Sequence, residues 1–410
     1  MELKPRGYDK VVALLKKGVK IPNPLTLDIG DEVEVSRISP AGVTIYPGCR
    51  LYGPQTVICE GAQIGLEGPV TIENCQVGPK VHLKGGYFKE SVFLDGAHMG
   101  LGAHVREGCI LEEQSGGAHC VGLKQTILFP FVTLGSLINF CDCLMAGGTH
   151  RKNHSEVGSS YIHFNFTPEG DKTTPSLIGD VPRGVMINQP PIFLGGQGGM
   201  VGPLRMGYGN VVAAGGILRR DFTQGGKLII PRPHRGAVLD YSPGGYGGLG
   251  RILKNNFLYI ANILALDQWY LHVRKPFLLR TEHGSFLWEG ARRNLALGVA
   301  ERIKRLRIMA EKIGADQKDR KEEGSLSSLK ENFSKKAEEI FEYFTLDRTW
   351  TAGKEFRDRF LEALHRKGAL KDDYINAIQA LPRHITQEGT RWLEETVNSL
   401  YQGALAILES

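Results

Sequence analysis

The stretch that decides the fold is residues 91–111, which read SVFLDGAHMGLGAHVREGCIL. Large apolar side chains stand six residues apart in it, at Phe93, Met99, Val105 and Leu111, and a small residue lies two positions before each of them. A repeat of six matches neither the period of a strand nor that of a helix. It is typical of a hexapeptide β-helix, in which short parallel strands alternate with tight turns around a narrow prism. We therefore expect the large residues to fill the interior of such a prism.

The same interval continues on both sides of this stretch. It recurs at Leu128, Leu134 and Phe140, at Met206, Val212 and Leu218, and less regularly at Ile58, Ile64 and Val70. We predict a mainly β solenoid, a parallel β-helix over residues 36–232, preceded by a lead-in over residues 1–35. The lead-in contains a short amphipathic helix at Tyr8–Lys17, which could cover the open end of the stack.

The second part of the chain has a helical pattern. Apolar residues recur at intervals of three and four, for example at Leu295, Val299, Ile303 and Leu306. Most of the 52 glycines lie in the first 250 residues, so composition also changes at this point. We predict a Pro/Gly-rich linker over residues 233–250 and an α-helical bundle over residues 251–410.

Composition narrows the function classes. The net charge of +6 is spread along the 410 residues, and no basic run alternates with aromatic residues, so nucleic acid is not an expected partner. No apolar stretch reaches the ~20 residues of a membrane span, and Met1–Lys20 does not resemble a signal peptide. The seven cysteines lack metal or redox spacing and are expected to be reduced packing residues of a cytoplasmic protein.

One long polar segment, His150–Asp180, interrupts the six-residue rhythm. Such an interruption in a regular scaffold is where function usually concentrates. The segment contains the residues that we consider as catalytic or substrate-binding candidates: His150, Asn153, His154, His163, Asn165, Phe166 and Lys172.

Two stretches around this segment carry a family resemblance. Residues 193–218, FLGGQGGMVGPLRMGYGNVVAAGGIL, and residues 157–180, VGSSYIHFNFTPEGDKTTPSLIGD, resemble the acetyltransferase half of the bifunctional N-acetylglucosamine-1-phosphate uridyltransferase/glucosamine-1-phosphate acetyltransferase. The resemblance extends to Arg232. It implies a left-handed β-helix, a homotrimer with active sites between neighbouring prisms, and acetyl-CoA or another acyl-CoA as co-substrate.

The resemblance also implies roles for single residues. Gly195, Gly196, Ala214 and Arg232 match its CoA-binding positions. Asn165 matches an asparagine at the reaction site, and Lys172 roughly matches a substrate-binding lysine, while Phe166 replaces a tyrosine and Gly196 a serine. Where the family carries a lysine pair, this chain has Cys141-Asp142.

Acyl transfer needs a general base, and histidine suits that role. Asn153-His154 resembles the context of the family's base, but His154 stands only 11 residues before Asn165, about two hexads closer than in the family. His163 is the second candidate and His150 the third. The predicted function is acyl transfer to an amino or hydroxyl group of a sugar, a sugar phosphate or a sugar nucleotide of the UDP-N-acetylglucosamine kind.

Two other readings stay open. One is a non-catalytic sugar-nucleotide-binding or structural trimer that has lost the transferase site. The other is a zinc enzyme of the γ-carbonic anhydrase kind, for which His82, His98, His104 and His119 are the available ligands. His98 and His104 stand six residues apart, which places them on successive faces of a prism, so no metal is expected.

Overall fold

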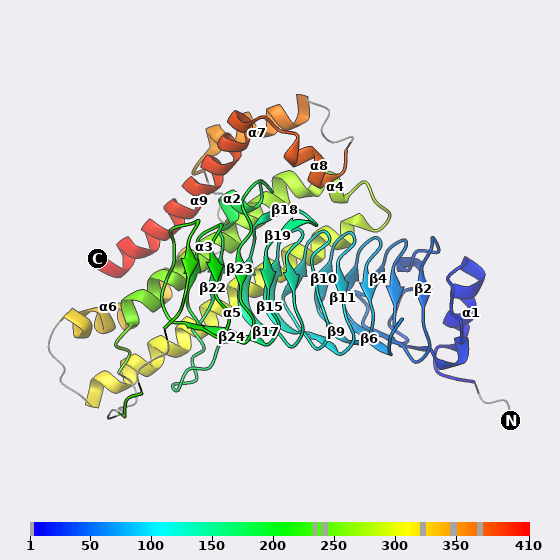
Figure 1. The fold of residues 1–410 in the computed structure, drawn as a ribbon, viewed down its shortest axis with the longest axis horizontal. Coiled ribbons are helices and arrows are strands. Elements are labelled where there is room, and N and C mark those ends of the chain that lie inside the picture. Colours follow the sequence, from blue (N-terminus) through cyan, green and yellow to red (C-terminus); the bar gives the residue numbers. More distant parts are fainter. Residues whose placement is uncertain are drawn as a thin grey trace.

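The first half of the chain is a triangular prism of parallel strands, and the second half is a set of helices packed along it (Figure 1). A computed structural model describes residues 4–232, 236–238, 240, 245–319, 325–344, 351–366 and 372–410. Ten strands form face 1 of the prism, and a second sheet of 16 strands wraps around the other two faces.

Face 1 comprises β2 (Thr44–Ile45), β5 (Gln63–Ile64), β8 (His82–Leu83), β11 (His98–Met99), β14 (Gly116–Gly117), β16 (Thr133–Leu134), β20 (Glu156–Val157), β23 (Phe193–Leu194), β26 (Val211–Val212) and β28 (Leu228–Ile229). Face 2 comprises β1 (Asp28–Ile29), β3 (Arg50–Tyr52), β6 (Val70–Glu73), β9 (Gly86–Lys89), β12 (Ala103–Val105), the first halves of β15 (Gly122–Leu128) and β17 (Asn139–Met145), β21 (Tyr161–Phe164), β24 (Gly198–Val201) and β27 (Ile217–Leu218). Face 3 comprises β4 (Val57–Ile58), β7 (Gln76–Val77), β10 (Ser91–Phe93), β13 (Cys109–Leu111), the second halves of β15 and β17, β22 (Ser176–Ile178) and β25 (Arg205–Met206). We name the edges of the prism corner 1–2, corner 2–3 and corner 3–1, after the faces that meet there.

The six-residue pattern produces this prism. Phe93 pairs with Leu111 on face 3, three hexads along the chain, while Met99 lies on face 1 and Val105 on face 2. All four side chains are fully buried in the prism interior. Each hexad therefore builds one side of a coil, and the predicted left-handed parallel β-helix followed by a helical region is confirmed.

Three insertions leave the prism at its corners. An antiparallel hairpin of β18 (Gly148–His150) and β19 (Asn153–His154) projects from corner 3–1. One coil later, the segment with α2 (Val181–Gly184) leaves the same corner, and the Gly148 N–H donates to the Gln189 carbonyl at 3.0 Å. Residues 165–175, between β21 and β22, form the insertion at corner 2–3.

At the N-terminal end of the prism lies α1 (Tyr8–Lys17), as Figure 1 shows. It contacts β1 and η2 (Val35–Arg37), and η1 (Pro24–Thr26) lies between α1 and β1 in the chain. The helix has the predicted bounds and covers the end where an open strand edge would otherwise be exposed. The prism already begins at Asp28, whereas we predicted residue 36, because β1 pairs in register with β3.

The helical part begins at Leu249, two residues before the predicted start at residue 251 and so within the predicted linker, of which residues 233–235, 239 and 241–244 lie outside the described residues. It comprises α3 (Leu249–Trp269), the π-helical turn η3 (Tyr270–Arg274), α4 (Lys275–Leu278), α5 (Gly284–Asp319), α6 (Ser325–Tyr343), α7 (Lys354–Arg366), α8 (Tyr374–Gln379) and α9 (Arg383–Glu409). Helix α5 contacts β7, β10 and β13, and α3 contacts β22, so these two helices cover face 3 (Figure 1).

Buried ion pairs and hydrogen bonds join the helices to the two corners that flank face 3. Arg302 on α5 donates to Asp142 on β17 at 2.6 Å, and both side chains are almost fully buried. Tyr270 donates to Glu112 at 2.6 Å. A helix packed on a bare apolar sheet could slide, whereas charged partners inside the contact fix its position. The bundle is therefore anchored to the prism at particular coils.

All seven cysteines are free, and five of them are buried packing residues: Cys49, Cys59, Cys75, Cys109 and Cys143. Cys141 is half-buried. Cys120 is exposed at corner 1–2, so the prediction that every cysteine packs in the interior is wrong for this residue. Within the described part of the chain, no helix combines the length and the apolar character needed to cross a bilayer.

Candidate functional site

Small residues of successive coils stack at corner 1–2. The Gly195 N–H donates to the Val212 carbonyl at 3.0 Å, and the Gly215 N–H donates to the Gly196 carbonyl at 3.0 Å. A Cβ atom on Gly195 would stand 2.4 Å from the Ala214 nitrogen, and one on Gly196 would stand 2.7 Å from the Ser159 carbonyl oxygen. Glycine is required here because the coils approach too closely for any side chain. The structure thus brings three of the predicted CoA-binding residues, Gly195, Gly196 and Ala214, together.

Arg232 lies at the same corner, one coil further on. Ile229 pairs with Val212, so Arg232 stands in the coil position that Gly215 occupies one turn earlier. The ring of Pro231 packs against Gly216, and the Arg232 side chain is exposed. A cationic side chain therefore stands at one end of the small-residue stack.

Asn165, Phe166 and Lys172 occupy the insertion at corner 2–3. The Lys172 carbonyl accepts a hydrogen bond from Arg302 at 3.2 Å, and the neighbouring Thr173 carbonyl accepts one from Asn256 at 3.1 Å. The Phe166 side chain is 73% exposed, and Asn165 is half-buried. Helices α3 and α5 thus hold this segment against the prism while its tip remains open to solvent.

His154 and Asn153 lie on the hairpin at corner 3–1. The His154 Nε2 atom is 3.8 Å from a Glu156 carboxylate oxygen, and its Nδ1 atom is buried without a partner among the described residues. Asn153 donates to the Thr149 hydroxyl at 2.9 Å, and the same hydroxyl lies 2.8 Å from Nδ1 of His150. The His154 imidazole thus has one nitrogen near Glu156 and one buried nitrogen without a partner among the described residues.

His163 lies inside the prism. Its Nε2 atom is 2.8 Å from the Ser176 hydroxyl, and 2% of the residue is exposed. Burial lowers the pKa of His163 to about 4, so the imidazole is neutral at physiological pH. We leave His163 out of the site proposed below, because its imidazole does not reach the surface at which a substrate would bind.

A groove on face 2 contains residues that the sequence analysis did not select for acyl transfer. It encloses about 430 Å³ and is lined by His104, Arg106, Lys124, Asn139 and Ile162, among others. His104 and Asn139 lie on either side of Gly122 in the strand register, and the missing side chain of Gly122 leaves room between them. The signal in the sequence is the spacing, since Arg106 and Lys124 stand 18 residues apart and a coil takes three hexads.

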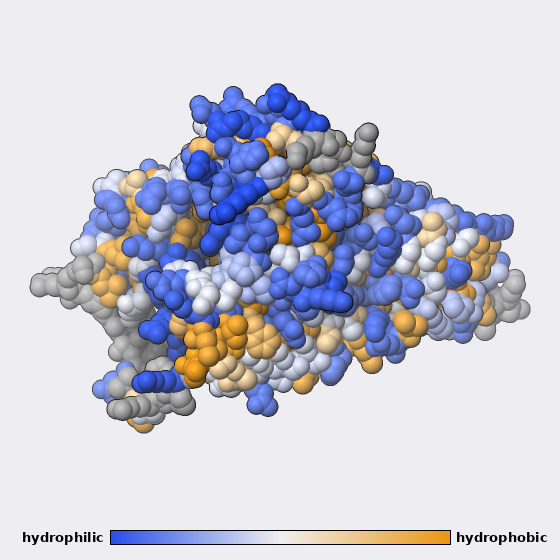
Figure 2. Space-filling model, turned by 45° about the horizontal axis from the view of Figure 1, so that its top comes forward, coloured by the Kyte–Doolittle hydropathy of each residue, from blue (hydrophilic) through white to orange (hydrophobic). Residues whose placement is uncertain are grey.

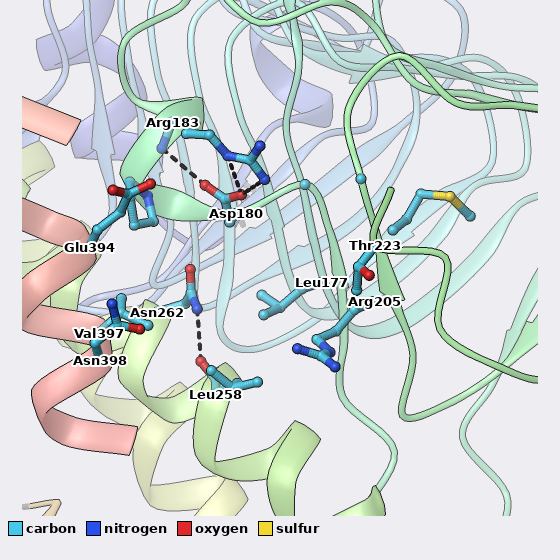
Figure 3. A pocket seen from close by; sticks show the side chains of 14 residues that line it. Leu177, Asp180, Arg183, Arg205, Thr223, Leu258, Asn262, Glu394, Val397 and Asn398 are labelled. Carbon is cyan, nitrogen blue, oxygen red and sulfur yellow. Dashed lines mark hydrogen bonds and ion pairs between the residues drawn. The ribbon is translucent and has the colours of Figure 1, made fainter. Parts of the chain in front are cut away.

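A second cavity, of about 270 Å³, lies between corner 3–1 and helices α3 and α9 (Figure 3). Asp180 accepts hydrogen bonds from the backbone and guanidinium of Arg183 at its rim, and Glu394 of α9 lies opposite this pair. Burial raises the pKa of Glu394. Most prism residues of this cavity lie between Leu177 and Thr223, within the stretch that carries the family resemblance.

The predicted site residues therefore occupy all three corners of the prism. The small-residue stack and the insertion at corner 2–3 both border face 2, and the groove lies on the same face in the coils from His104 to Ile162. The His154 hairpin lies at corner 3–1, which does not border face 2. A single chain thus presents the proposed cofactor and acceptor residues on one face and the proposed base on another.

Comparison with curated proteins identifies relatives for about half of the chain. It is 28% identical over 213 residues to a protein of Thermotoga maritima, which is 52% of this chain and 42% of that protein. A protein of Pelobacter propionicus is 27% identical over 221 residues, 54% of this chain and 43% of its own length. Both carry the same name. The chain is similar to bifunctional protein GlmU.

The chain spans less than half the length of the GlmU proteins that it matches, and no family model matches it. The matches and the solenoid together support a GlmU-like β-helix domain. The chain differs from the family pattern at Asp142, which stands where the resemblance places a lysine pair. Here Asp142 is buried against Arg302 of α5. In this chain Asp142 instead anchors the helical region through Arg302.

The histidines considered as zinc ligands lie on different faces of the prism. His82 and His98 are register neighbours on face 1, whereas His104 lies on face 2. Among the residues that the structure describes, no three His, Cys, Asp or Glu side chains are placed to hold a metal ion together.

Proposed function

We propose that this protein is an acyl-CoA-dependent acyltransferase that transfers an acyl group, in the first instance acetyl, to an amino or hydroxyl group of a sugar, sugar phosphate or sugar nucleotide. The observation that carries the proposal is the stack of Gly195, Gly196 and Ala214 at corner 1–2, with exposed Arg232 one coil beyond it. The similarity to GlmU supports the broader class, a transferase in sugar-phosphate metabolism.

The stack offers an extended cofactor a path along exposed backbone. A pantetheine arm has amide groups that hydrogen-bond to backbone N–H and C=O groups, and closely stacked glycines let it approach them. Arg232 is the cation for the phosphates of the nucleotide end, because a guanidinium pairs well with phosphate oxygens. The arrangement holds the thioester end toward the groove on face 2.

The acceptor sits in this groove. His104, Arg106 and Lys124 line it, and Asn165 and Lys172 lie in the insertion at corner 2–3, the corner at which face 2 ends. Asn165 orients the attacking group, and the cations bind a phosphate of the acceptor. In the reaction the acceptor nitrogen or oxygen forms a bond to the thioester carbonyl carbon, the carbon–sulfur bond breaks, and CoA leaves as the thiolate. A general base removes the acceptor's proton.

His154 serves as that base from a neighbouring chain. It cannot border face 2 of its own prism, and a trimer of prisms places a corner of one copy against a face of the next. Asn153, beside it on the hairpin, then contacts the acceptor bound to the neighbour. The site is therefore shared between copies, and the functional unit is a homotrimer.

A thermal-shift titration with acetyl-CoA, followed by a thiol-release assay with a panel of amino sugars, sugar phosphates and sugar nucleotides, tests the proposal. Acetyl-CoA is expected to raise the melting temperature, since a ligand that binds the native state stabilises it. Mixed trimers of His154→Ala and Arg232→Ala chains should recover part of the activity that each variant lacks. If calorimetry finds no binding of CoA or acetyl-CoA, the acyltransferase proposal is wrong.

A non-catalytic, sugar-nucleotide-binding trimer is the second candidate. It is favoured by Gly196 and Phe166, which carry no hydroxyl where the resemblance places serine and tyrosine. Binding of sugar nucleotides without binding of any CoA ester would support this candidate. Turnover that depends on His154 would exclude it.

A further inference from the structure

A cavity separate from all the residues above lies between corner 3–1 and the roof that η3, α4 and α8 make over it. It encloses about 560 Å³, within the range of small-molecule sites. Its prism wall comes from corner residues of four successive coils, represented by Glu60, Lys80, Asp95 and Glu113. The rim is exposed, whereas the floor, formed by Arg274, Glu113 and Tyr374, is buried.

Arg274 is the central residue of this floor. Its side chain is completely buried, and one nitrogen, Nη2, donates to a Glu113 oxygen at 2.5 Å. The guanidinium carbon lies 3.7 Å from the centre of the Tyr374 ring. Among the described residues, its Nε and Nη1 atoms have no hydrogen-bond partner. Two buried charged donors without acceptors are costly, unless a bound molecule supplies the acceptors.

Buried acceptors in the same cavity also lack donors. One Glu113 oxygen pairs with Arg274, and the other, Oε2, has no partner in the described part of the chain. The Oε2 atom of Glu60 is likewise buried and unpartnered there. Three residues that line this one cavity, Glu60, Glu113 and Arg274, thus carry buried donors or acceptors without partners among the described residues.

We propose that this cavity binds a neutral, polyhydroxylated small molecule of about monosaccharide size. A hydroxyl group is both a donor and an acceptor, so adjacent hydroxyls can satisfy Arg274 and the two carboxylates together. The free Nε and Nη1 atoms belong to different edges of the guanidinium, and separated oxygens fit them better than one bidentate carboxylate.

The charge of the lining favours a neutral ligand over an anion. Five carboxylate side chains line the cavity against three cationic ones. A phosphorylated ligand would meet this excess of negative charge. The roof adds apolar contact through Phe277 and Leu278, which suits the carbon faces of a sugar ring. This inference does not rest on the proposed acyl transfer.

Calorimetry of the full-length protein with D-glucose, myo-inositol, glucose 6-phosphate and glycine tests the proposal without CoA. The two neutral polyols are expected to bind. Arg274→Met should weaken their binding by about tenfold or more, and Glu60→Met, at the edge of the cavity and less demanding for folding, by roughly 3–10-fold, since each removes hydrogen bonds to a charged group. Glu289→Met, an exposed position of α5 outside the cavity, should leave polyol affinity unchanged.

If neither polyol binds at tens of millimolar to folded protein, the inference is wrong. It is equally wrong if only glucose 6-phosphate or only glycine binds, or if Glu60→Met and Glu289→Met bind polyols as tightly as the unchanged chain. None of these outcomes bears on acetyl-CoA binding, which is measured separately at corner 1–2.

Discussion

At the scale of single residues, Arg232 offers the most direct test of cofactor binding. It is exposed, and among the described residues no hydrogen bond or ion pair of its side chain would be lost with it. Arg232→Ala is expected to weaken acetyl-CoA binding by ~1.5–3 kcal/mol, the value of a hydrogen bond to a charged group. Calorimetry measures the change, with Arg366→Ala on α7 as a matched surface control. Equal affinity of the two variants would contradict the assignment of Arg232.

Glu112 gives a prediction for pH dependence. Burial raises the pKa of Glu112 to about 7, above its usual value of 4.5. The native state therefore binds more protons than the unfolded state between these values, so this carboxyl stabilises the fold below pH 4.5 and loses that contribution as pH rises to about 7. Over this pH range the contribution of Glu112 to the unfolding free energy should fall by an amount on the order of 1–3 kcal/mol.

Urea denaturation at pH 5 and pH 7.5 measures this contribution. The fall in unfolding free energy between the two pH values should be smaller in Glu112→Gln than in the unchanged chain, because glutamine does not titrate. Glu338→Gln, on the exposed surface of α6, serves as the control. If all three proteins show the same pH dependence, Glu112 is not the titrating group.

At the scale of secondary-structure elements, the attachment of α5 to β17 is the feature that mutation can test most directly. Arg302→Ala leaves the buried Asp142 carboxylate without its partner, and we expect a loss of about 3–5 kcal/mol in unfolding free energy. The double variant Arg302→Leu with Asp142→Leu should recover most of that loss. A single variant as stable as the unchanged chain, measured by chemical denaturation, would contradict an anchoring role.

The secondary-structure elements also show which features could be predicted from the sequence. The hexad at Phe93 and Leu111 predicts the strands because it depends only on local spacing, and the insertions at corners follow from breaks in that spacing. The residues of the small-residue stack were predicted from the family resemblance. The burial of His163 could not, because strand alternation alone does not say which side of β21 faces the interior next to an irregular insertion. The roof over corner 3–1 could not be predicted either, because it depends on contacts between residues 150 or more positions apart, such as Arg274 with Glu113.

At the scale of the whole molecule, the uncovered faces carry apolar side chains in register. Phe193, Val211 and Leu228 are exposed neighbours on face 1, and Figure 2 shows apolar side chains gathered on the prism below the helices. Since α3 and α5 cover face 3, the proposed trimer would be formed through faces 1 and 2. Light scattering at micromolar concentration should give three times the 45.2 kDa chain mass.

Val211→Glu is expected to shift this trimer toward monomer, because it places a charge in the apolar contact without altering the buried interior. Lys227→Glu, an exposed charge reversal next to the same row, is the control. A monomer in the unchanged chain would contradict both the trimer and a site shared between copies.

The course of α5 along the prism has a consequence for how the molecule unfolds. In a solenoid each coil contacts only its neighbours, so coils can detach one after another from an end. Here a helix of 36 residues, about 54 Å long, bonds to coils far apart in the stack, from Gln76 through Cys109 to Asp142. Loss of one coil then disrupts the helix that holds the others. Hydrogen exchange of the prism amides bridged by α5 should therefore proceed at one common rate, whereas the coils before β4, which α5 does not reach through these bonds, should exchange earlier and in order from the end.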